Sequence, residues 1–337
     1  FGQRAIMALF RKKENPEIDF APGETVGGEY KILKEISRGG MGIVYHASEA
    51  RQNREVALKF LPSALARNKN AVENLKREAT ITMALSHPNI VQTYAFVDDK
   101  GYKYVVMEYV DGPTLEEVLD DSGKLSIKEM IKWVEGLCKG LQYAHENGIL
   151  HRDIKPSNLM MHKGSLVKIT DFGIARKMKN QMYKLTKTIR LGTPPYMSPE
   201  QLMGEYVDHR SDIYSVGVLV YECLNGVPPF SEGSIETQIM LKKPRDLLDV
   251  PEYINETIMT ALNKYPQNRF NSALDFFDAL TGLRKPLAVP AQQVEPAKMA
   301  RKRPAAAAAE TPRVLVVDDE SDIRSLIGAL LKAAGFE

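Results

Sequence analysis

The sequence predicts an α+β protein with two lobes, a small β-rich lobe and a larger helical lobe, followed by a βα fragment at the C-terminal end. Short apolar-rich runs, typical of strands, fill the first third of the chain. Apolar residues then recur with a helical period over 127–145. The composition, 44% apolar and 26% charged, is that of a folded globular chain and excludes the fibrous and disordered classes.

The small lobe is predicted at about 30–107, after an N-terminal arm over 1–29. Its apolar runs predict strands at 30–36, 42–47, 55–60 and 102–108, with one good helix at 70–86.

The larger lobe is predicted at about 111–284, so that both lobes together form one domain over 30–284. Its clearest helix is 127–145, and Gly148 is a suitable stop for that helix.

Two further segments follow the second lobe. Residues 285–310 contain four prolines, a basic cluster and five consecutive alanines, which predicts an extended linker. Residues 311–337 begin with the apolar run Val314–Val317, continue with Asp318 and Asp319, and end in a helical pattern. They predict one strand–helix unit.

The bulk properties narrow the class of partner and the compartment. A net charge of +2 favours no polyanion, so no nucleic-acid partner is expected. No apolar run approaches the roughly 18 residues of a membrane span, and no secretory signal is present. Cys138 and Cys223 lie among apolar residues and are expected to be buried thiols in a reducing compartment, which predicts a cytoplasmic location.

A glycine-rich loop between two predicted strands is a candidate phosphate site. Glycines let backbone amides approach phosphate closely, although an ordinary hairpin uses the same residues. The loop residues are Ile36, Ser37, Arg38, Gly39, Gly40, Met41, Gly42, Ile43 and Val44.

Polar residues further along the chain have the types that phosphoryl transfer needs. The carboxylate of Asp153 suits a base that accepts the proton of a substrate hydroxyl, and Lys155 suits the charge on the transferred phosphate. Asn158 and Asp171 offer hard oxygen ligands for Mg²⁺. Lys59 closes an apolar strand, where an ammonium held toward phosphate is the functional alternative to a surface lysine.

In this order the motifs resemble those of the protein kinase family, and in particular of bacterial eukaryotic-like (Hanks-type) serine/threonine kinases. The resemblance covers residues 30–284 and rests on the glycine loop and on Val56–Lys59, His151–Asp153, Asp171–Gly173 and Ser198–Glu200. It implies the two-lobed protein-kinase fold and an enzyme that transfers the γ-phosphate of ATP to Ser/Thr of proteins. Mg²⁺ is the implied metal, with Mn²⁺ as an alternative.

The resemblance also assigns roles to single residues. Lys59, paired with Glu78, holds the α- and β-phosphates, and Asp153 is the catalytic base. Lys155, two residues after that base, marks Ser/Thr specificity. The adenine ring lies against side chains of both lobes and the backbone of the segment between them, with Met107 as gatekeeper. The residues implied there are Val44, Ala57, Met107, Glu108, Val110 and Met160.

Further residues are implied in scaffolding and regulation. Thr193 contacts the catalytic loop, Glu200 pairs with Arg269, and Asp212 braces the loop backbone. Arg152 precedes the catalytic base, which is typical of kinases activated by activation-loop phosphorylation. Phosphate on Thr186 or Thr188, placed by autophosphorylation with dimerisation as one route, would pair with Arg152. His145 and His151 are expected to be packing residues, His151 beneath Phe172.

Two features leave alternatives open. Ser37 stands where the family has the first glycine of its loop, and a negative φ is required there.

Residues 311–337 resemble the opening of a response-regulator receiver domain, so a kinase–receiver fusion truncated at both ends is the hypothesis. The rival readings are a pseudokinase scaffold and a regulated input module of a two-component protein. A kinase of small molecules is disfavoured by the segment 192–200.

Overall fold

A computed structural model describes residues 18–39, 42–99, 101–163, 166–172 and 194–284. Several predictions therefore lie outside the described residues. They concern the start of the arm, the linker, the receiver-like fragment, and Gly40, Met41, Thr186, Thr188 and Thr193. The side chain of Glu78 is also outside the description, although its backbone belongs to a described helix.

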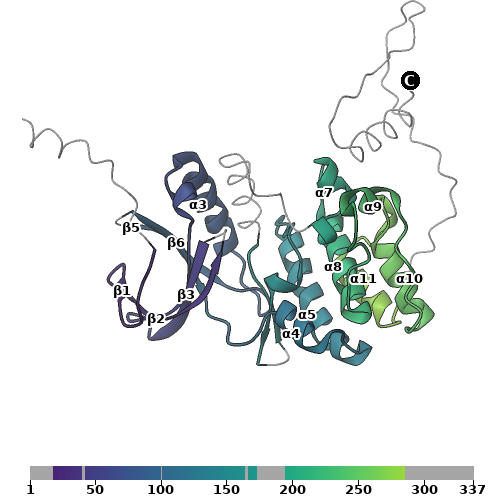
Figure 1. The fold of residues 1–337 in the computed structure, drawn as a ribbon, viewed down its shortest axis with the longest axis horizontal. Helices are drawn as coiled ribbons and strands as arrows, with labels where there is room; N and C mark the ends of the chain where they lie inside the picture. The colour runs from purple at the N-terminus through teal and green to yellow at the C-terminus, as the bar shows by residue number, and fades with distance from the viewer. Residues whose placement is uncertain (1–17, 40–41, 100, 164–165, 173–193, 285–337) are drawn as a thin grey trace, which may run out of the picture.

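The first lobe is a six-stranded antiparallel sheet with the order β1-β2-β3-β4-β6-β5 (Figure 1). The strands are β1 (Thr25–Val26), β2 (Tyr30–Gly39), β3 (Gly42–Glu49), β4 (Arg54–Phe60), β5 (Thr93–Asp99) and β6 (Tyr102–Glu108). The four predicted strands are thus present, and β6 has the predicted bounds. β5 was not predicted, because its short apolar run shows no clean alternation.

The sheet begins before residue 30. Thr25 and Val26 pair with β2, and Val26 is 4% exposed. Phe20 packs its ring against Tyr45 and Phe60. Within the arm predicted over 1–29, these residues therefore pack against the first lobe.

One helix covers part of the sheet. The short α2 (Ser63–Ala66) leads into α3 (Lys69–Met83), which lies beside β5 and is capped at its start by the Asn68 side chain. Leu65, Leu75 and Ala79 form a small apolar cluster beneath these helices. The helix predicted at 70–86 is therefore confirmed, three residues shorter at its C-terminal end.

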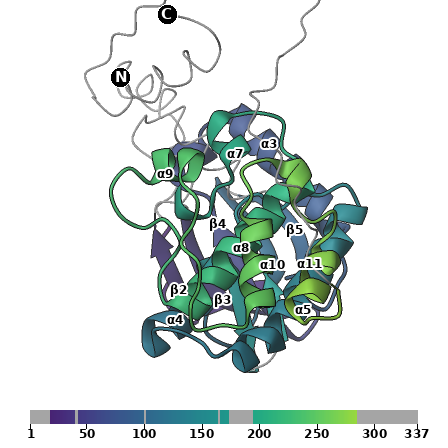
Figure 2. The ribbon, with the colours of Figure 1, turned by 90° about the vertical axis from the view of Figure 1, so that its right-hand side faces the viewer.

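The second lobe is built around α8 (His209–Asn225), of which residues 211–221 are all buried (Figure 2). Its other helices are α4 (Leu115–Ser122), α5 (Ile127–Glu146), α7 (Pro199–Met203), α9 (Ile235–Leu241), α10 (Glu252–Ala261) and α11 (Ala273–Leu280). Short 3₁₀ turns occur at Pro156–Asn158, Pro194–Tyr196 and Pro266–Asn268. The helix predicted at 127–145 is confirmed, and Gly148 follows it with φ +71°.

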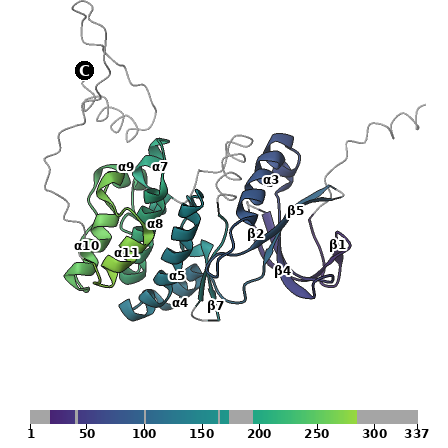
Figure 3. The same cartoon turned by 180° about the vertical axis from the view of Figure 1, so that it is seen from behind.

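A two-stranded hairpin, β7 (Leu159–His162) and β8 (Leu166–Ile169), lies beside α4 and α5 on the side facing the sheet (Figure 3). The segment that leads from α3 into β5 pairs with this hairpin, because Val91 donates to the Ile169 carbonyl at 2.9 Å. Cys138 and Cys223 are both buried and free, as predicted. Within the described ranges, no helix has the length and apolar character needed to cross a bilayer.

Candidate active site

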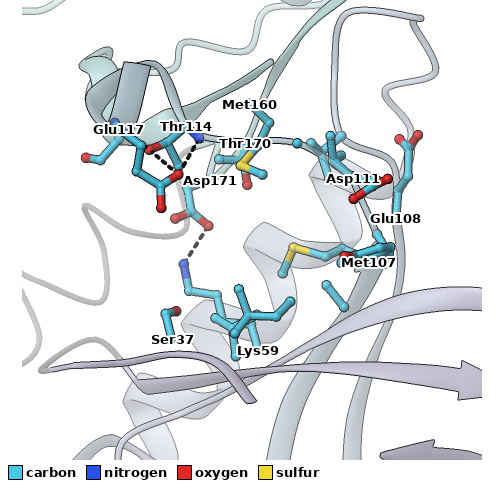
Figure 4. A pocket seen from close by; sticks show the side chains of 18 of the residues that line it. Ser37, Lys59, Met107, Glu108, Asp111, Thr114, Glu117, Met160, Thr170 and Asp171 are labelled. Carbon is cyan, nitrogen blue, oxygen red and sulfur yellow. Dashed lines mark hydrogen bonds and ion pairs between the residues drawn. The ribbon is translucent and has the colours of Figure 1, made fainter. Parts of the chain in front are cut away.

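A cavity of about 540 Å³ lies between the two lobes (Figure 4). Its walls include ten of the residues predicted for nucleotide or metal binding: Ile36, Ser37, Val44, Ala57, Lys59, Met107, Glu108, Val110, Met160 and Asp171. Val44 and Ala57 come from the sheet and Met160 from β7, so the two lobes supply opposite walls. The structure thus brings together residues that are far apart in the sequence.

The glycine loop divides its side chains between two faces. Ser37 pairs with Val44, and both line the cavity. Arg38 pairs with Ile43, on the other face: Arg38 forms an ion pair with Glu35, and Ile43 is buried in the sheet core. The side chains of Arg38 and Ile43 therefore do not line the cavity as predicted, because successive strand residues point to opposite faces.

Two backbone positions in this loop matter. Gly42 has φ +120°, and a Cβ there would lie 1.9 Å from the Phe60 carbonyl oxygen, so only glycine fits. Ser37 is not among the residues with positive φ. The serine in place of the family's glycine therefore causes no backbone strain.

Lys59 and Asp171 meet at the inner end of the cavity. The Lys59 Nζ lies 2.5 Å from Asp171 Oδ1, and both side chains are mostly buried (Figure 4). Burial alone would raise the pKa of Asp171, but the Lys59 ammonium outweighs that effect and holds the pKa below its usual value. Asp171 is therefore ionised at neutral pH. The predicted partner Glu78 cannot be placed, since its side chain is outside the description.

The catalytic-loop residues form a compact hydrogen-bonded group. Asn158 Nδ2 donates to the Asp153 carbonyl at 2.7 Å and to Asp153 Oδ2 at 3.2 Å. The Lys155 Nζ lies 3.6 Å from the same carboxylate oxygen. A carboxylate, an ammonium and an amide are therefore held within one short loop.

Asp212 holds this loop from beneath. Its carboxylate accepts hydrogen bonds from the backbone N–H groups of His151 at 2.9 Å and Arg152 at 2.7 Å. His145 Nε2 lies 2.8 Å from the same carboxylate. His145 is thus more than the packing residue that was predicted, since it contacts the group that braces the loop. Arg152 has φ +67°, a conformation that this bracing maintains.

His151 and Phe172 lie together as predicted. Their ring centroids are 4.6 Å apart in an edge arrangement, and His151 Nε2 lies 2.8 Å from the Thr170 carbonyl. His151 is completely buried. It therefore fixes the segment leading to Asp171 and has no access to a substrate.

The predicted pair of Glu200 and Arg269 is present. Arg269 donates to both carboxylate oxygens, at 2.7 and 2.8 Å, and Ser211 donates to one of them. Burial opposes ionisation of Glu200, but the Arg269 guanidinium holds its pKa below the usual value. The pair joins α7 to the segment before α11, at a distance from the cavity.

One ion pair at the cavity wall was not predicted from the sequence. Lys168 on β8 lies 2.7 Å from Glu108, the residue that ends β6. Glu108 also accepts from the backbone N–H of Gln92 at 3.2 Å. In the sequence, Lys168 is a single charged residue between the apolar residues Val167 and Ile169. A lysine between two buried neighbours needs a partner for its charge, and this position was the signal that could have indicated the ion pair.

The oxygens of Asn158 and Asp171 suit a divalent cation. Asn158 donates to Asp153 through its side-chain nitrogen, and its side-chain oxygen is an acceptor by its chemistry. Asp171 accepts from Lys59 through Oδ1 and has a second carboxylate oxygen, Oδ2. Mg²⁺ binds through one or two protein oxygens together with substrate phosphates, so two oxygens at a phosphate site fit it. No larger group of His, Cys, Asp or Glu suited to a metal occurs among the described residues.

The chain is similar in sequence to a known family and to curated bacterial proteins. Residues 30–299 match the family model of the protein kinase domain. A probable serine/threonine-protein kinase of Streptomyces coelicolor is 41% identical over 261 residues, which is 74% of this chain and 39% of that protein. Serine/threonine-protein kinase PknB of Mycolicibacterium smegmatis is 38% identical over 258 residues, which is 73% of this chain and 41% of that protein. The chain spans about two fifths of the length of these relatives.

The fold is also that of a solved structure. The crystal structure of the Mycobacterium tuberculosis PknI kinase domain superimposes with a TM-score of 0.65 at 26% sequence identity. The match covers 78% of this chain and 98% of that one.

Proposed function

The chain belongs to the protein kinase family, and we propose that it is a serine/threonine kinase that transfers the γ-phosphate of ATP to hydroxyl groups of proteins. The observation that carries this proposal is the pair of Lys59 and Asp171 in the wall of the interlobe cavity, together with the catalytic loop, in which Asp153, Lys155 and Asn158 contact one another and Ser157 lines the same cavity. A nucleotide-binding scaffold without activity needs none of the catalytic-loop residues.

Each residue has a step that its contacts support. The backbone of Glu108 and Val110 binds the adenine edge, while Val44, Ala57 and Met160 cover the ring. Lys59 holds the α- and β-phosphates. Asp153 accepts the proton of the attacking hydroxyl, and Lys155 neutralises charge on the transferred phosphate. Mg²⁺, held by Asn158 and Asp171, supplies charge stabilisation on the phosphates when bound.

Regulation is a further part of the proposal. Arg152 has an exposed side chain, and its backbone is held by Asp212 and by Gln201, which donates to the Arg152 carbonyl at 3.0 Å. A phosphate on Thr186 or Thr188, added by autophosphorylation between two copies, would find this guanidinium on a rigid support. A Thr186/Thr188 double alanine variant is expected to lose most activity, and full activity in that variant would contradict this part.

The experiment that tests the activity is phosphate incorporation from labelled ATP with Mg²⁺. The wild-type chain is expected to label Ser or Thr residues, and Asp153→Asn is expected to lose the label because the proton acceptor is gone. ATP binding by the variant, measured in parallel, controls for folding. Equal labelling of both proteins would overturn the proposal, and binding without transfer by the wild type would favour the pseudokinase alternative.

The role of residues 311–337 remains a separate proposal that rests on their sequence pattern. They are proposed to begin a receiver domain, which would make the kinase an input module of a two-component protein. The acceptor aspartate of a receiver lies on a later strand than residues 311–337 contain, so the test uses the product of the natural gene: it is expected to accept phosphate from acetyl phosphate, and truncation at residue 310 is expected to abolish this transfer. Absence of such transfer would contradict this role and leave the kinase proposal intact.

A further inference from the structure

A second cavity lies in the helical lobe, on the other side of the chain segment that borders the nucleotide cavity. Its volume is about 270 Å³, roughly that of nine water molecules in the liquid. Its walls come from the segment before α4, from α4, α5 and β7: Pro113, Leu115, Val118, Leu125, Trp133 and Met161, with Glu129 and Lys132.

The two cavities share a wall that is one residue thick. Thr114 and Met160 line the nucleotide cavity and form an isolated bridge with each other (Figure 4). Their neighbours Leu115 and Met161 line the second cavity. Met161 also donates to the Pro113 carbonyl at 2.8 Å, which holds the wall together. The side chains therefore alternate between two separate spaces, as they do across a strand.

The chemistry of the second cavity is apolar with one cationic group. Leu115 and Trp133 are buried and present hydrocarbon and ring surface. Of the two charged residues, Glu129 is committed to the helix cap, since its Oε2 accepts from the Ser126 N–H at 2.9 Å and from the Ser126 hydroxyl at 2.6 Å. Lys132, one turn further along α5, forms no ion pair with any of the described residues and is exposed. The hydrogen bonds from Ser126 lower the pKa of Glu129, and the Lys132 ammonium adds to this effect.

The indole of Trp133 adds a polar group without a partner. Its Nε1–H is buried, and the described residues offer it no acceptor. A buried donor without an acceptor is costly, and because Trp133 lines the cavity, an occupant with an oxygen atom within reach of the indole would offset that cost.

We propose that this cavity is a binding site for a small apolar molecule that ends in a carboxylate, such as a medium-chain fatty acid. The hydrocarbon part fills the space between Leu115, Val118 and Met161. The carboxylate faces Lys132 at the mouth. The site is separate from the nucleotide cavity, so both are occupied at the same time.

The test uses octanoate as the probe and Trp133 as the reporter. Trp133 is the only tryptophan of the chain, so its fluorescence reports on this cavity alone. Titration of the full chain with octanoate is expected to give a saturable change. Octanol, without the charge, binds more weakly, and octylammonium binds most weakly because its charge repels Lys132.

Three variants make the test specific. Val118→Phe fills the cavity and is expected to weaken octanoate binding about tenfold or more. Lys132→Met weakens octanoate binding roughly two- to fivefold, the size of an exposed charge pair, and leaves octanol binding unchanged. Lys128→Met removes an exposed lysine one turn earlier on α5 that does not line the cavity, and it should behave as the wild type.

In the presence of saturating ATP and Mg²⁺, octanoate is expected to produce the same change in Trp133 fluorescence as in their absence. Loss of that signal on adding ATP would place octanoate in the nucleotide cavity and overturn the proposal. An absent saturable change in the wild type, or equal octanoate affinity in the wild type and Val118→Phe, would also overturn it. ATP binding by Val118→Phe shows whether that variant is folded, and Leu125→Phe fills the same cavity from another element if it is not.

Discussion

Asp171 adopts a backbone conformation that few residues other than glycine adopt, with φ +63°. Arg152, in the catalytic loop, has a similar value. Such conformations cost about 1–3 kcal/mol each and persist only where surrounding contacts impose them. Here the contacts are known: Asp212 holds the Arg152 backbone, and His151 and Lys59 hold the segment around Asp171. Among the described residues, two of the four non-glycine residues with positive φ thus belong to the candidate site, and the other two are Asn53 and Lys163.

Lys59→Met is expected to lower kcat/KM for phosphoryl transfer by about 100-fold or more, because it removes the cation that is proposed to hold the phosphates. It also removes the main group that lowers the pKa of Asp171. The measurement is steady-state phosphorylation of a peptide at saturating Mg²⁺. Lys128→Met, an exposed lysine on α5, is the control, and the same loss in both variants would contradict a specific role for Lys59.

At the scale of elements, the glycine loop depends on close contact between two strands. β3 begins at Gly42, and there it lies against the carbonyl of Phe60, the last residue of β4. Nothing lies within 4 Å of a Cβ built on Gly39. Packing therefore requires glycine at position 42 but not at position 39.

Gly42→Ala is expected to destabilise the small lobe by about 1–3 kcal/mol and to weaken ATP binding, because the new methyl group collides with the β4 backbone at a positive φ. Gly39→Ala is the matched control and should change stability by less than about 1 kcal/mol. Thermal unfolding and ATP titration check both variants. Equal effects of the two substitutions would show that the Gly42 contact is unimportant.

The ion pair of Glu200 and Arg269 joins elements of the helical lobe. Glu200→Gln leaves the buried guanidinium without its charge partner, and we expect a loss of roughly 3–5 kcal/mol in the free energy of unfolding at pH 7. Glu135→Gln, which removes an exposed pair with Lys139, should cost at most about 0.5 kcal/mol. Denaturant unfolding measures both.

The ion pair of Glu200 and Arg269 also predicts how the free energy of unfolding depends on pH. The pKa of Glu200 is lowered in the folded state, so its contribution to stability is present above the ordinary value of 4.5 and is lost as the pH falls through the folded pKa. The stability difference between the wild type and Glu200→Gln should therefore narrow as the pH falls below about 4.5. A constant difference down to pH 3 would contradict the assignment.

At the scale of the whole molecule, two lobes with separate cores meet at few points. The sheet core and the helical core share no residues. The chain from Asn89 to Gln92 pairs with β8 on one side and with Glu108 on the other. The ion pair of Lys168 and Glu108 lies at this junction, so the lobe that carries β8 is tied directly to the end of β6.

Lys168→Met is expected to lower stability by about 1–3 kcal/mol and to raise the KM for ATP more than it lowers kcat, because it loosens the segment proposed to bind adenine. Lys103→Met, on β6, breaks a more exposed pair with Asp98 and is the control. An unchanged KM for ATP in Lys168→Met would show that the junction pair has no role in nucleotide binding.

Local pattern was sufficient to predict four of the strands, the helix of the first lobe and the longest helix of the second, and to propose the residues of the candidate site. Strand and helix periods placed four strands and the helix of residues 127–146, because those periods follow from burial on one face. The motifs placed Lys59, Asp153, Asn158 and Asp171, because phosphoryl transfer requires these residue types. The strand β5 escaped prediction, since its pattern carries no clear period.

Contacts between distant residues required the three-dimensional fold. The pairing of Lys168 with Glu108, the binding of His145 to Asp212, and the alternation that turns Arg38 and Ile43 away from the cavity depend on which strands and helices become neighbours. The second cavity behind Thr114 and Met160 has the same origin. A side chain's own sequence neighbourhood specifies its element, whereas its partner is specified by packing between elements that lie far apart in the chain.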